Sequence, residues 1–268
     1  MVFPPLDPAT ACILVTNDDG INAPGLVSLI SIARELSEDI WVVAPETNQS
    51  GAAHSLSLSK PLRAREVSER RWAVDGTPTD CVLFAVRHLL TDKPPTLVLS
   101  GVNRGTNLAD DVTYSGTVAA AMEGCLLGIR SIALSQSYSN PSDVKWQTAE
   151  RHGAEVVRRV LAVEWSHEAL INVNFPAVDP DGVSGMEITR QGHLGFGGHI
   201  IERTDPRGSP YYWISYTPTA RDLVPGTDIE ALRRGAISIN PLHLDLTHEA
   251  MRRRLRDAFA RGPAGAKA

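Results

Sequence analysis

The 268-residue sequence has few cysteines, few aromatic residues and no long apolar run. Its cysteines, Cys12, Cys81 and Cys125, are odd in number and widely spaced, which argues against a disulfide framework and favours reduced, structural thiols. No stretch approaches the roughly 18 apolar residues of a membrane span. Residues 1–10 lack the positive and apolar regions of a secretory signal. We therefore expect a cytoplasmic protein without a membrane segment.

Several common nucleotide and hydrolase motifs are also missing. There is no Gly-x-Gly-x-x-Gly fingerprint, no glycine loop with a Walker lysine and no Gly-x-Ser-x-Gly elbow. Dinucleotide, P-loop and α/β-hydrolase interpretations are therefore disfavoured, and the histidines lack the mutual spacing of zinc ligands. The net charge of −5 argues against a nucleic-acid polymer as partner, although a small phosphorylated ligand needs only a few local donors.

Short apolar runs alternate with helical patterns along the first two thirds of the chain. The runs lack polar alternation, which is typical of strands whose sheet is covered by helices on both faces. Buried strands are predicted at residues 12–16, 40–44, 96–99, 131–134 and 170–173. Helices are predicted at residues 26–33, 78–90, 117–127 and 143–163, with Thr77 and Ser115 as N-caps.

The pattern changes after Phe175, where glycine and proline become frequent. Two apolar segments, 200–201 and 211–214, flank the turn-rich sequence DPRGSP and predict a β-hairpin, followed by a strand at 236–239 and a helix at 248–259. The fold class is therefore α/β, with a doubly wound, mostly parallel sheet and a C-terminal hairpin arm. We divide the chain into a catalytic core (11–180), an arm that returns to the core (181–247), and a terminal helix with a frayed tail (248–268).

The loops that follow the predicted strands carry oxygen ligands. Ligands of doubly wound sheets bind beyond the carboxyl ends of the strands, where Asp18 and Asp19 follow the first strand. Two adjacent carboxylates repel each other unless a cation lies between them. Ser50 and Asn103, in neighbouring loops, would complete an oxygen site suited to Mg²⁺ or Mn²⁺. Asp-Gly is also a common turn dipeptide, and the residues alone leave both interpretations open.

A second candidate is Ser115-Gly116-Thr117 at a predicted helix start. Backbone N–H groups and hydroxyls at such a position form a natural phosphate site, although Ser115 could equally be an ordinary N-cap. The roles of His54, Arg104 and the pair Asp110-Asp111 remain undecided, since each could contact a ligand or brace its own loop.

The sequence resembles the SurE (survival protein E) family of nucleotidases. The matching stretches run in the family's order from Ile13 to Thr247. They are ILVTNDDGINAPG, VVAPETNQSGAAHS, DGTPTDCV, LSGVNRGTNLADDVTYSGTVAAAMEG, ITRQGH, TDPRGSPYYWI, PGTDIEAL and ISINPLHLDLT. The 26-residue stretch from Leu99 to Gly124 carries most of this resemblance.

The resemblance implies a Rossmann-like core with an arm exchanged between subunits, giving homo-dimers or homo-tetramers. It implies hydrolysis of nucleoside 5′- and 3′-monophosphates, in some members also short polyphosphate, with one Mg²⁺ or Mn²⁺. It places the metal ligands on Asp18, Asp19, Ser50 and Asn103. The phosphate contacts then fall on Asn107, Ser115, Gly116 and Thr117, and we expect Asp18, Asp19 and Asn107 to be catalytic.

Other functions and mechanisms stay open at this point. A nucleotide-sugar transferase also uses acidic metal loops on a Rossmann-like sheet, and a non-catalytic protein would bind nucleotide without turnover. For the hydrolase, we favour direct attack by water over a phospho-aspartate at Asp18 or Asp19, because both carboxylates are expected on the metal.

Overall fold

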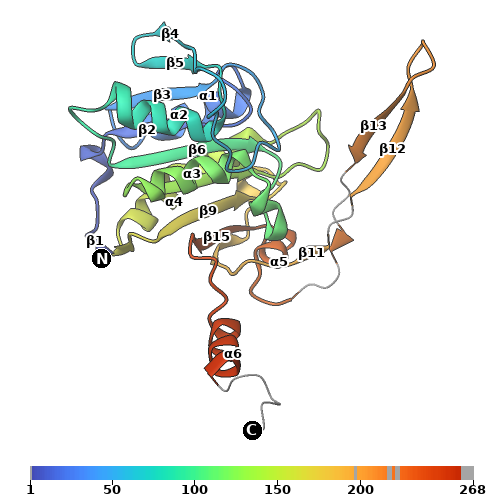
Figure 1. Ribbon diagram of the computed structural model, residues 1–268. Helices are drawn as coiled ribbons and strands as arrows, with labels where there is room; N and C mark the ends of the chain where they lie inside the picture. The colour runs from blue at the N-terminus through green and yellow to red at the C-terminus, as the bar shows by residue number, and fades with distance from the viewer. Residues whose placement is uncertain (1, 196–197, 216–218, 221–223, 261–268) are drawn as a thin grey trace.

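The structure is a computed structural model that describes residues 2–195, 198–215, 219–220 and 224–260. Its centre is a nine-stranded sheet with the order β10-β15-β9-β7-β6-β2-β3-β5-β4 (Figure 1). The five predicted strands form its parallel middle. They are β2 (Ile13–Thr16), β3 (Ile40–Pro45), β6 (Leu97–Arg104), β7 (Arg130–Gln136) and β9 (Ala169–Phe175).

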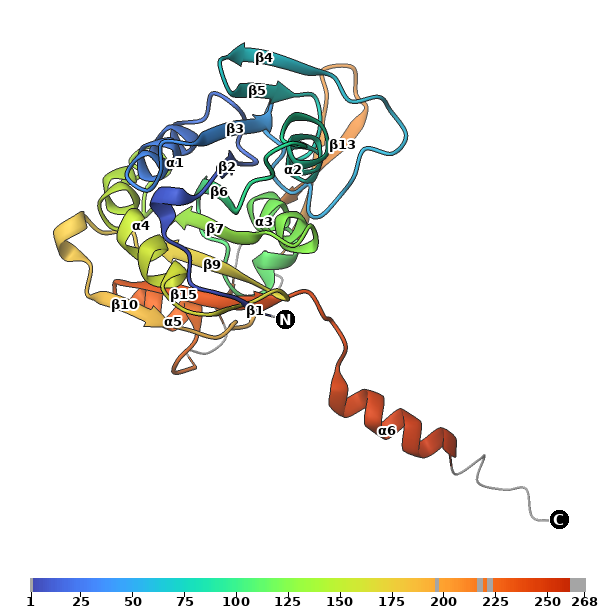
Figure 2. The same ribbon diagram turned by 90° about the vertical axis from the view of Figure 1, so that its left-hand side faces the viewer.

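Helices cover both faces of this sheet, as the uniformly apolar strands predict (Figure 2). On β2, Ile13 and Val15 join the core beneath α1 (Pro24–Arg34) and α4 (Trp146–Leu161). Leu14, between them, joins the core beneath α2 (Pro78–Phe84) and α3 (Gly116–Leu126). Successive side chains of a strand point to opposite faces, so a strand buried on both sides carries no polar alternation. The predicted doubly wound α/β class is confirmed.

Two helix starts agree with the sequence. Thr77 caps α2 in a capping box with Asp80, and Ser115 caps α3 by accepting from the Val118 N–H at 3.0 Å. The predicted helix over 78–90 continues past α2 as a π-helical turn at Ala85–Leu89. The predicted helix over 143–163 is shorter, because α4 begins at Trp146.

The edges of the sheet were not predicted. β4 (Ala64–Ser68) and β5 (Arg71–Val74) form one edge, and β10 (Gly185–Ile188) forms the other. β4 is exposed along most of its length, so it lacks the apolar run that marks the central strands. β15 (Ala236–His243) extends the predicted strand and runs antiparallel to β9 and parallel to β10. A short β1 (Val2–Phe3) pairs with β8 (Trp165–Ser166).

The predicted hairpin and terminal helix both project from the sheet (Figures 1 and 2). β12 (His199–Thr204) pairs with β13 (Pro210–Ser215), while β11 (Leu194–Gly195) and β14 (Thr219–Ala220) pair at the base of this hairpin. α6 (Glu249–Ala260) buries none of its residues. The predicted tail, 261–268, lies outside the described residues.

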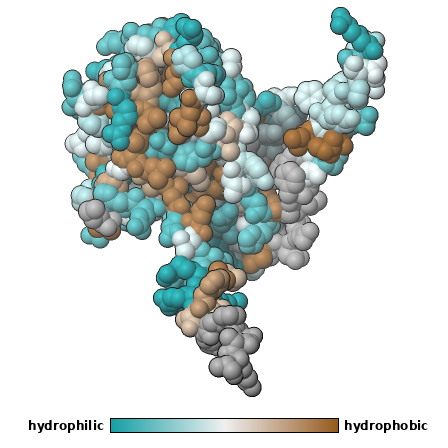
Figure 3. Space-filling view, in the orientation of Figure 1, coloured by the Kyte–Doolittle hydropathy of each residue, from teal (hydrophilic) through white to brown (hydrophobic). Residues whose placement is uncertain are grey.

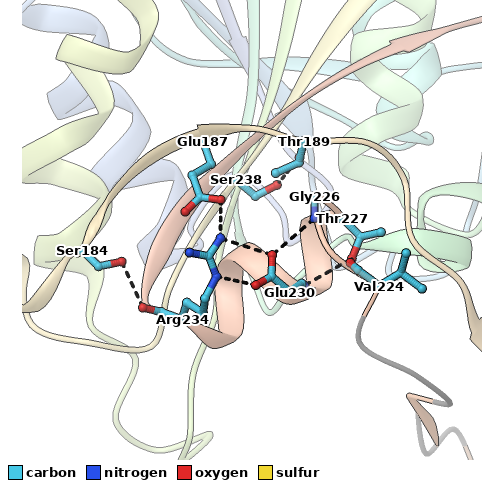
Figure 4. A network of polar contacts seen from close by, with 9 residues as sticks. All are labelled: Ser184, Glu187, Thr189, Val224, Gly226, Thr227, Glu230, Arg234 and Ser238. Carbon is cyan, nitrogen blue, oxygen red and sulfur yellow. Dashed lines mark hydrogen bonds and ion pairs between the residues drawn. The ribbon is translucent and has the colours of Figure 1, made fainter.

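A polar network fastens the chain where it returns from the hairpin to the sheet. Arg234 follows α5 (Asp228–Arg233) and binds Glu187 of β10 at 2.6 Å and Glu230 of its own helix (Figure 4). The hydroxyl of Ser184 donates to the Arg234 carbonyl at 3.0 Å. These contacts fix α5 against β10. The first residue of α5, Asp228, contributes to the site described below.

Candidate functional site

One cavity of about 530 Å³ lies at the carboxyl ends of the central strands, beside the start of α3. Five of the eight predicted site residues line it: Asp18, Ser50, Asn103, Asn107 and Ser115. Of the other three, Asp19 and Gly116 adjoin lining residues in sequence, and Thr117 follows Gly116. The remaining lining residues are Gly51, Arg104, Thr106, Asp111, Tyr114 and Ile214.

Asp18 is held against the first turn of α3. The hydroxyl of Thr117 donates to Asp18 Oδ1, and the Asp18 carbonyl accepts from the Gln49 N–H at 2.8 Å. A Cβ on Gly116 would lie 2.8 Å from Asp18 Cβ and 3.0 Å from Asp18 Oδ2. Only a residue without a side chain therefore allows the carboxylate to approach the positive end of this helix so closely.

The pKa of Asp18 is raised to about 6, mainly by burial, against the opposing effect of the Thr117 hydroxyl and with a smaller contribution from the neighbouring Asp19. Burial also raises the pKa of Asp19, while the Arg104 N–H and the charge of Arg104 lower it. The protein groups around this pair therefore do not fully compensate two negative charges, and a bound cation would do so.

Asp19 connects two of the loops around the cavity. Its Oδ2 accepts from the Arg104 N–H at 3.2 Å, and its Oδ1 accepts from the Asn48 side-chain amide at 3.4 Å. The same Asn48 side chain accepts from the Ser50 N–H at 2.8 Å. Asp19 thus lies between the end of β6 and the loop that carries Ser50.

An irregularity in β6 directs Asn103 towards the cavity. The register between β6 and β7 shifts between Ser100 and Asn103, and Gly101 has a φ of +133°. A Cβ on Gly101 would lie 2.2 Å from the Leu134 carbonyl oxygen, so glycine is required there. The Asn103 amide nitrogen donates to the Gly105 carbonyl at 3.0 Å. Its oxygen, the atom that a cation would bind, is not used in this bond.

Asn107 is fixed by side chains of the neighbouring strands. Its N–H donates to Asn174 Oδ1 at 2.9 Å, and its carbonyl accepts from the side chains of Asn172 and Asn174. Its own amide nitrogen donates to Ser135 Oγ at 2.8 Å. Asn172 and Asn174 were not among the predicted site residues, although two asparagines inside an apolar strand are a detectable signal.

Asp228, which was also not among the predicted site residues, connects a segment next to the cavity with the C-terminal part of the chain. It is fully buried, and its carboxylate accepts from the N–H groups of Ala109, Gly192 and Ile229 at 2.8–2.9 Å. Ala109 begins the 3₁₀ segment Ala109–Thr113 that leads to Tyr114 and Ser115. We refer to this arrangement as the Asp228 clamp.

The residues whose roles the sequence left undecided separate into two groups. His54 does not line the cavity and contacts Glu123 of α3 at 3.0 Å, while Asp110 accepts from the Leu194 N–H at 2.9 Å. Both contacts brace loops. Arg104 and Asp111 do line the cavity, and the Arg104 guanidinium donates to the Pro141 carbonyl.

The donor set at the cavity is chemically selective. Among the residues that the structure describes, no three His, Cys, Asp or Glu side chains gather in a metal-binding cluster. A cation here would therefore depend on hydroxyl and amide oxygens beside the two carboxylates, which favours a hard ion over zinc.

No helix in the described part of the chain is long and apolar enough to cross a bilayer.

Comparisons with known proteins agree with these features. The family model described as Survival protein SurE matches residues 13–197. A protein from Paramagnetospirillum magneticum called 5′-nucleotidase SurE is 59% identical over 260 residues, covering 97% of this chain and 100% of that protein. A protein of the same name from Parvibaculum lavamentivorans is 55% identical, with 92% and 90% covered.

A solved structure shares the fold as well. The crystal structure of the SurE protein from Aquifex aeolicus superposes with a TM-score of 0.80 at 38% identity, covering 92% of this chain and 99% of that one. The resemblance found from the sequence is thereby confirmed: the chain belongs to the SurE family.

Proposed function

We propose that this protein is a divalent-metal-dependent phosphatase that hydrolyses nucleoside 5′-monophosphates, and also 3′-monophosphates, to nucleoside and phosphate. The observation that carries the proposal is Asp18, buried against a helix start through Gly116 at the edge of a cavity of about 530 Å³. This volume lies within the range of small-molecule sites. The relatives called 5′-nucleotidase SurE support the substrate class.

Asp18, Asp19, Ser50 and Asn103 would hold one Mg²⁺ or Mn²⁺. The raised pKa values of both carboxylates support this donor set, as does the oxygen of Asn103, which takes no part in the bond to Gly105. When bound, the cation would withdraw charge from a phosphate oxygen and make water more acidic.

The chain itself would position the phosphate group. The Ser115 hydroxyl accepts from the Val118 N–H and keeps its own proton, whereas both the hydroxyl and the N–H of Thr117 are bonded to Asp18. The Ser115 O–H, the Gly116 N–H and the second proton of the Asn107 amide would therefore be the donors to the phosphate. Water then attacks phosphorus, the bond to the ribose oxygen breaks, and a proton passes to the leaving alcohol. The transition state is stabilised by fixed charge and dipoles.

Direct attack by water is favoured over a phospho-aspartate, because Asp18 and Asp19 each accept hydrogen bonds that hold them as fixed ligands. Rapid-quench kinetics tests this choice. We expect no burst of nucleoside before steady turnover, whereas a burst matching the enzyme concentration would indicate a covalent intermediate.

The activity is tested by phosphate release from a panel of nucleoside 5′- and 3′-monophosphates. We expect turnover with Mg²⁺ or Mn²⁺ and its loss after treatment with a chelator. Equal turnover in metal-stripped protein would contradict the metal requirement. Nucleotide binding without turnover would indicate a binding protein, and glycosyl transfer from nucleotide-sugars would indicate a transferase.

The ligand role is tested by Asp19→Asn with excess Mn²⁺. We expect kcat to fall about 10²-fold, since an amide replaces one charged group of the site. Asp75→Asn, at an exposed position outside the cavity, serves as the control. Full activity of Asp19→Asn would contradict the role.

A further inference from the structure

The cavity is lined by two chemically different sets of residues. One set carries carboxylate, hydroxyl and amide groups and includes the proposed phosphate site. Two large apolar side chains also line the cavity, Tyr114 and Ile214. They are 54% and 75% exposed, so each presents much of its surface to whatever occupies the cavity.

Tyr114 adjoins the phosphate site through the backbone. It directly precedes Ser115, the N-cap of α3, so its Cα lies only about 3.8 Å from that of the cap residue. When a phosphate ester is bound at the start of α3, the Tyr114 ring is close enough to contact a group attached to the sugar of that ester.

Ile214 reaches the same cavity from β13 of the hairpin. Side chains alternate along a strand, so Tyr212 and Ile214 share one face of β13, and Tyr211 and Trp213 share the other, where their rings lie 6.3 Å apart. Ile214 pairs with Ile200. Figure 3 shows hydrophobic surface on the part of the hairpin nearest the body and hydrophilic surface at its tip.

A ligand that matches this cavity is charged at one end and flat and apolar at the other. Stacking of a nucleobase on an aromatic side chain gives substantial affinity and tolerates every base, because each base has a π-face. Resting on the proposed function, we propose that Tyr114 and Ile214 form the nucleobase subsite and recognise the base by ring contact rather than by its hydrogen-bonding edge.

This subsite makes the enzyme favour nucleotides over sugar phosphates. It also makes purine nucleotides better substrates than pyrimidine nucleotides, because they offer a larger ring surface, with little discrimination between adenine and guanine. The decisive quantity is the ratio of kcat/KM for a purine nucleoside monophosphate to kcat/KM for ribose 5-phosphate, which lacks a base.

We expect Tyr114→Ala to lower this ratio about 10-fold, mainly through the KM for the nucleotide. Tyr114→Phe keeps the ring and restores the ratio, and Ile214→Ala lowers it about threefold through loss of apolar contact. Trp213→Ala, on the opposite face of the same strand, is the matched control and leaves the ratio within twofold. Circular dichroism verifies that each variant is folded.

The inference is overturned if Tyr114→Ala lowers both kcat/KM values equally, or changes neither, while wild-type protein hydrolyses nucleotides. If wild-type protein hydrolyses no phosphate ester, the proposed function fails, and calorimetric titration with adenosine still tests the subsite. Adenosine that binds wild-type protein and Tyr114→Ala equally well, or binds neither, then overturns it.

Discussion

Gly116 sets the distance between Asp18 and the start of α3. Its missing side chain lets the carboxylate lie in the positive field of the helix end while Thr117 donates to it. Within the same helix, Gly124 serves a different purpose, because a Cβ there would lie 2.3 Å from Ser131 Oγ on β7 and 2.9 Å from Val98 Cγ2 on β6. One glycine therefore shapes the site, and the other permits close packing of helix on sheet.

This difference yields a paired prediction. Gly116→Ala displaces Asp18, and we expect kcat/KM to fall about 10²-fold with a small loss of stability. Gly124→Ala overpacks the contact between α3 and the sheet, and we expect a loss of about 1–3 kcal/mol with kcat/KM per folded molecule retained. Urea unfolding and phosphate-release assays measure both quantities. The reverse pattern would contradict the assignment of Gly116 to the site.

At the scale of elements, the Asp228 clamp joins segments far apart in sequence. The carboxylate at the start of α5 holds the 3₁₀ segment after β6 and the strand connection at Gly192. Gln191 adds a bond to the Ala109 carbonyl at 2.8 Å. The wall of the cavity is thus supported by the segment from which the hairpin starts.

Asp228→Asn tests the clamp. Both carboxylate oxygens accept backbone N–H groups, so an amide nitrogen must face a donor in any orientation. We expect unfolding free energy to fall by about 2 kcal/mol. We also expect KM for nucleotide to rise, because Tyr114 and Ser115 follow the released segment. Asp181→Asn, at an exposed position, is the control. Wild-type stability in Asp228→Asn would show that the clamp contributes little.

The ion pairs of Asp39 predict a pH dependence of stability. It precedes β3 and forms ion pairs with Arg70 and Lys93, and the hydrogen bond from Lys93 is the main reason that its pKa is lowered. A lowered folded-state pKa stabilises the protein above the unfolded value of about 4, and this contribution is lost as the pH falls through the folded pKa.

Asp39→Asn should therefore lose stability at pH 6 and approach wild type at pH 3. Urea midpoints at the two values, with Glu69→Gln as an exposed control, measure the difference. An equal loss at both pH values would show that the charge of Asp39 is not responsible.

Across the whole molecule, the buried strands could be predicted from the sequence and the exposed strands could not. The central strands were readable because residues such as Leu14 and Val15 are buried on opposite faces and leave an uninterrupted apolar run. The edge strands were not, because segments such as Ala64–Ser68 are mostly exposed and carry no distinctive pattern.

Some residues of the candidate site could also be predicted from the sequence, and others could not. Asp18 and Asn103 were found because each follows a readable strand. Asp228 and Ile214 lie about a hundred or more residues away from the loops that they approach, and only the tertiary structure brings them there. Local sequence patterns contain no information on contacts of that range.

Exposed apolar residues on α6 favour an assembly of several chains. Met251, Leu255 and Phe259 recur at four-residue spacing along one stripe, and all three are exposed, Phe259 by 84%. A homo-dimer or homo-tetramer, which the resemblance to the SurE family implies, would cover this stripe and stays a prediction.

Light scattering after gel filtration tests the prediction. We expect a mass at least twice the 29.0 kDa of one chain. Leu255→Asp combined with Phe259→Asp should lower it, while Arg256→Ala, on the same helix, should not. A wild-type mass of one chain would contradict the prediction.

The position of β15 has a consequence for synthesis of the protein. This strand lies between β9 and β10 in the sheet but follows both of them in the sequence, shortly after the clamp residue of α5. A nascent chain that stops before Ala236 leaves β9 and β10 without the strand that joins them. We therefore expect the nine-stranded sheet to close only after residues 236–243 have left the ribosome.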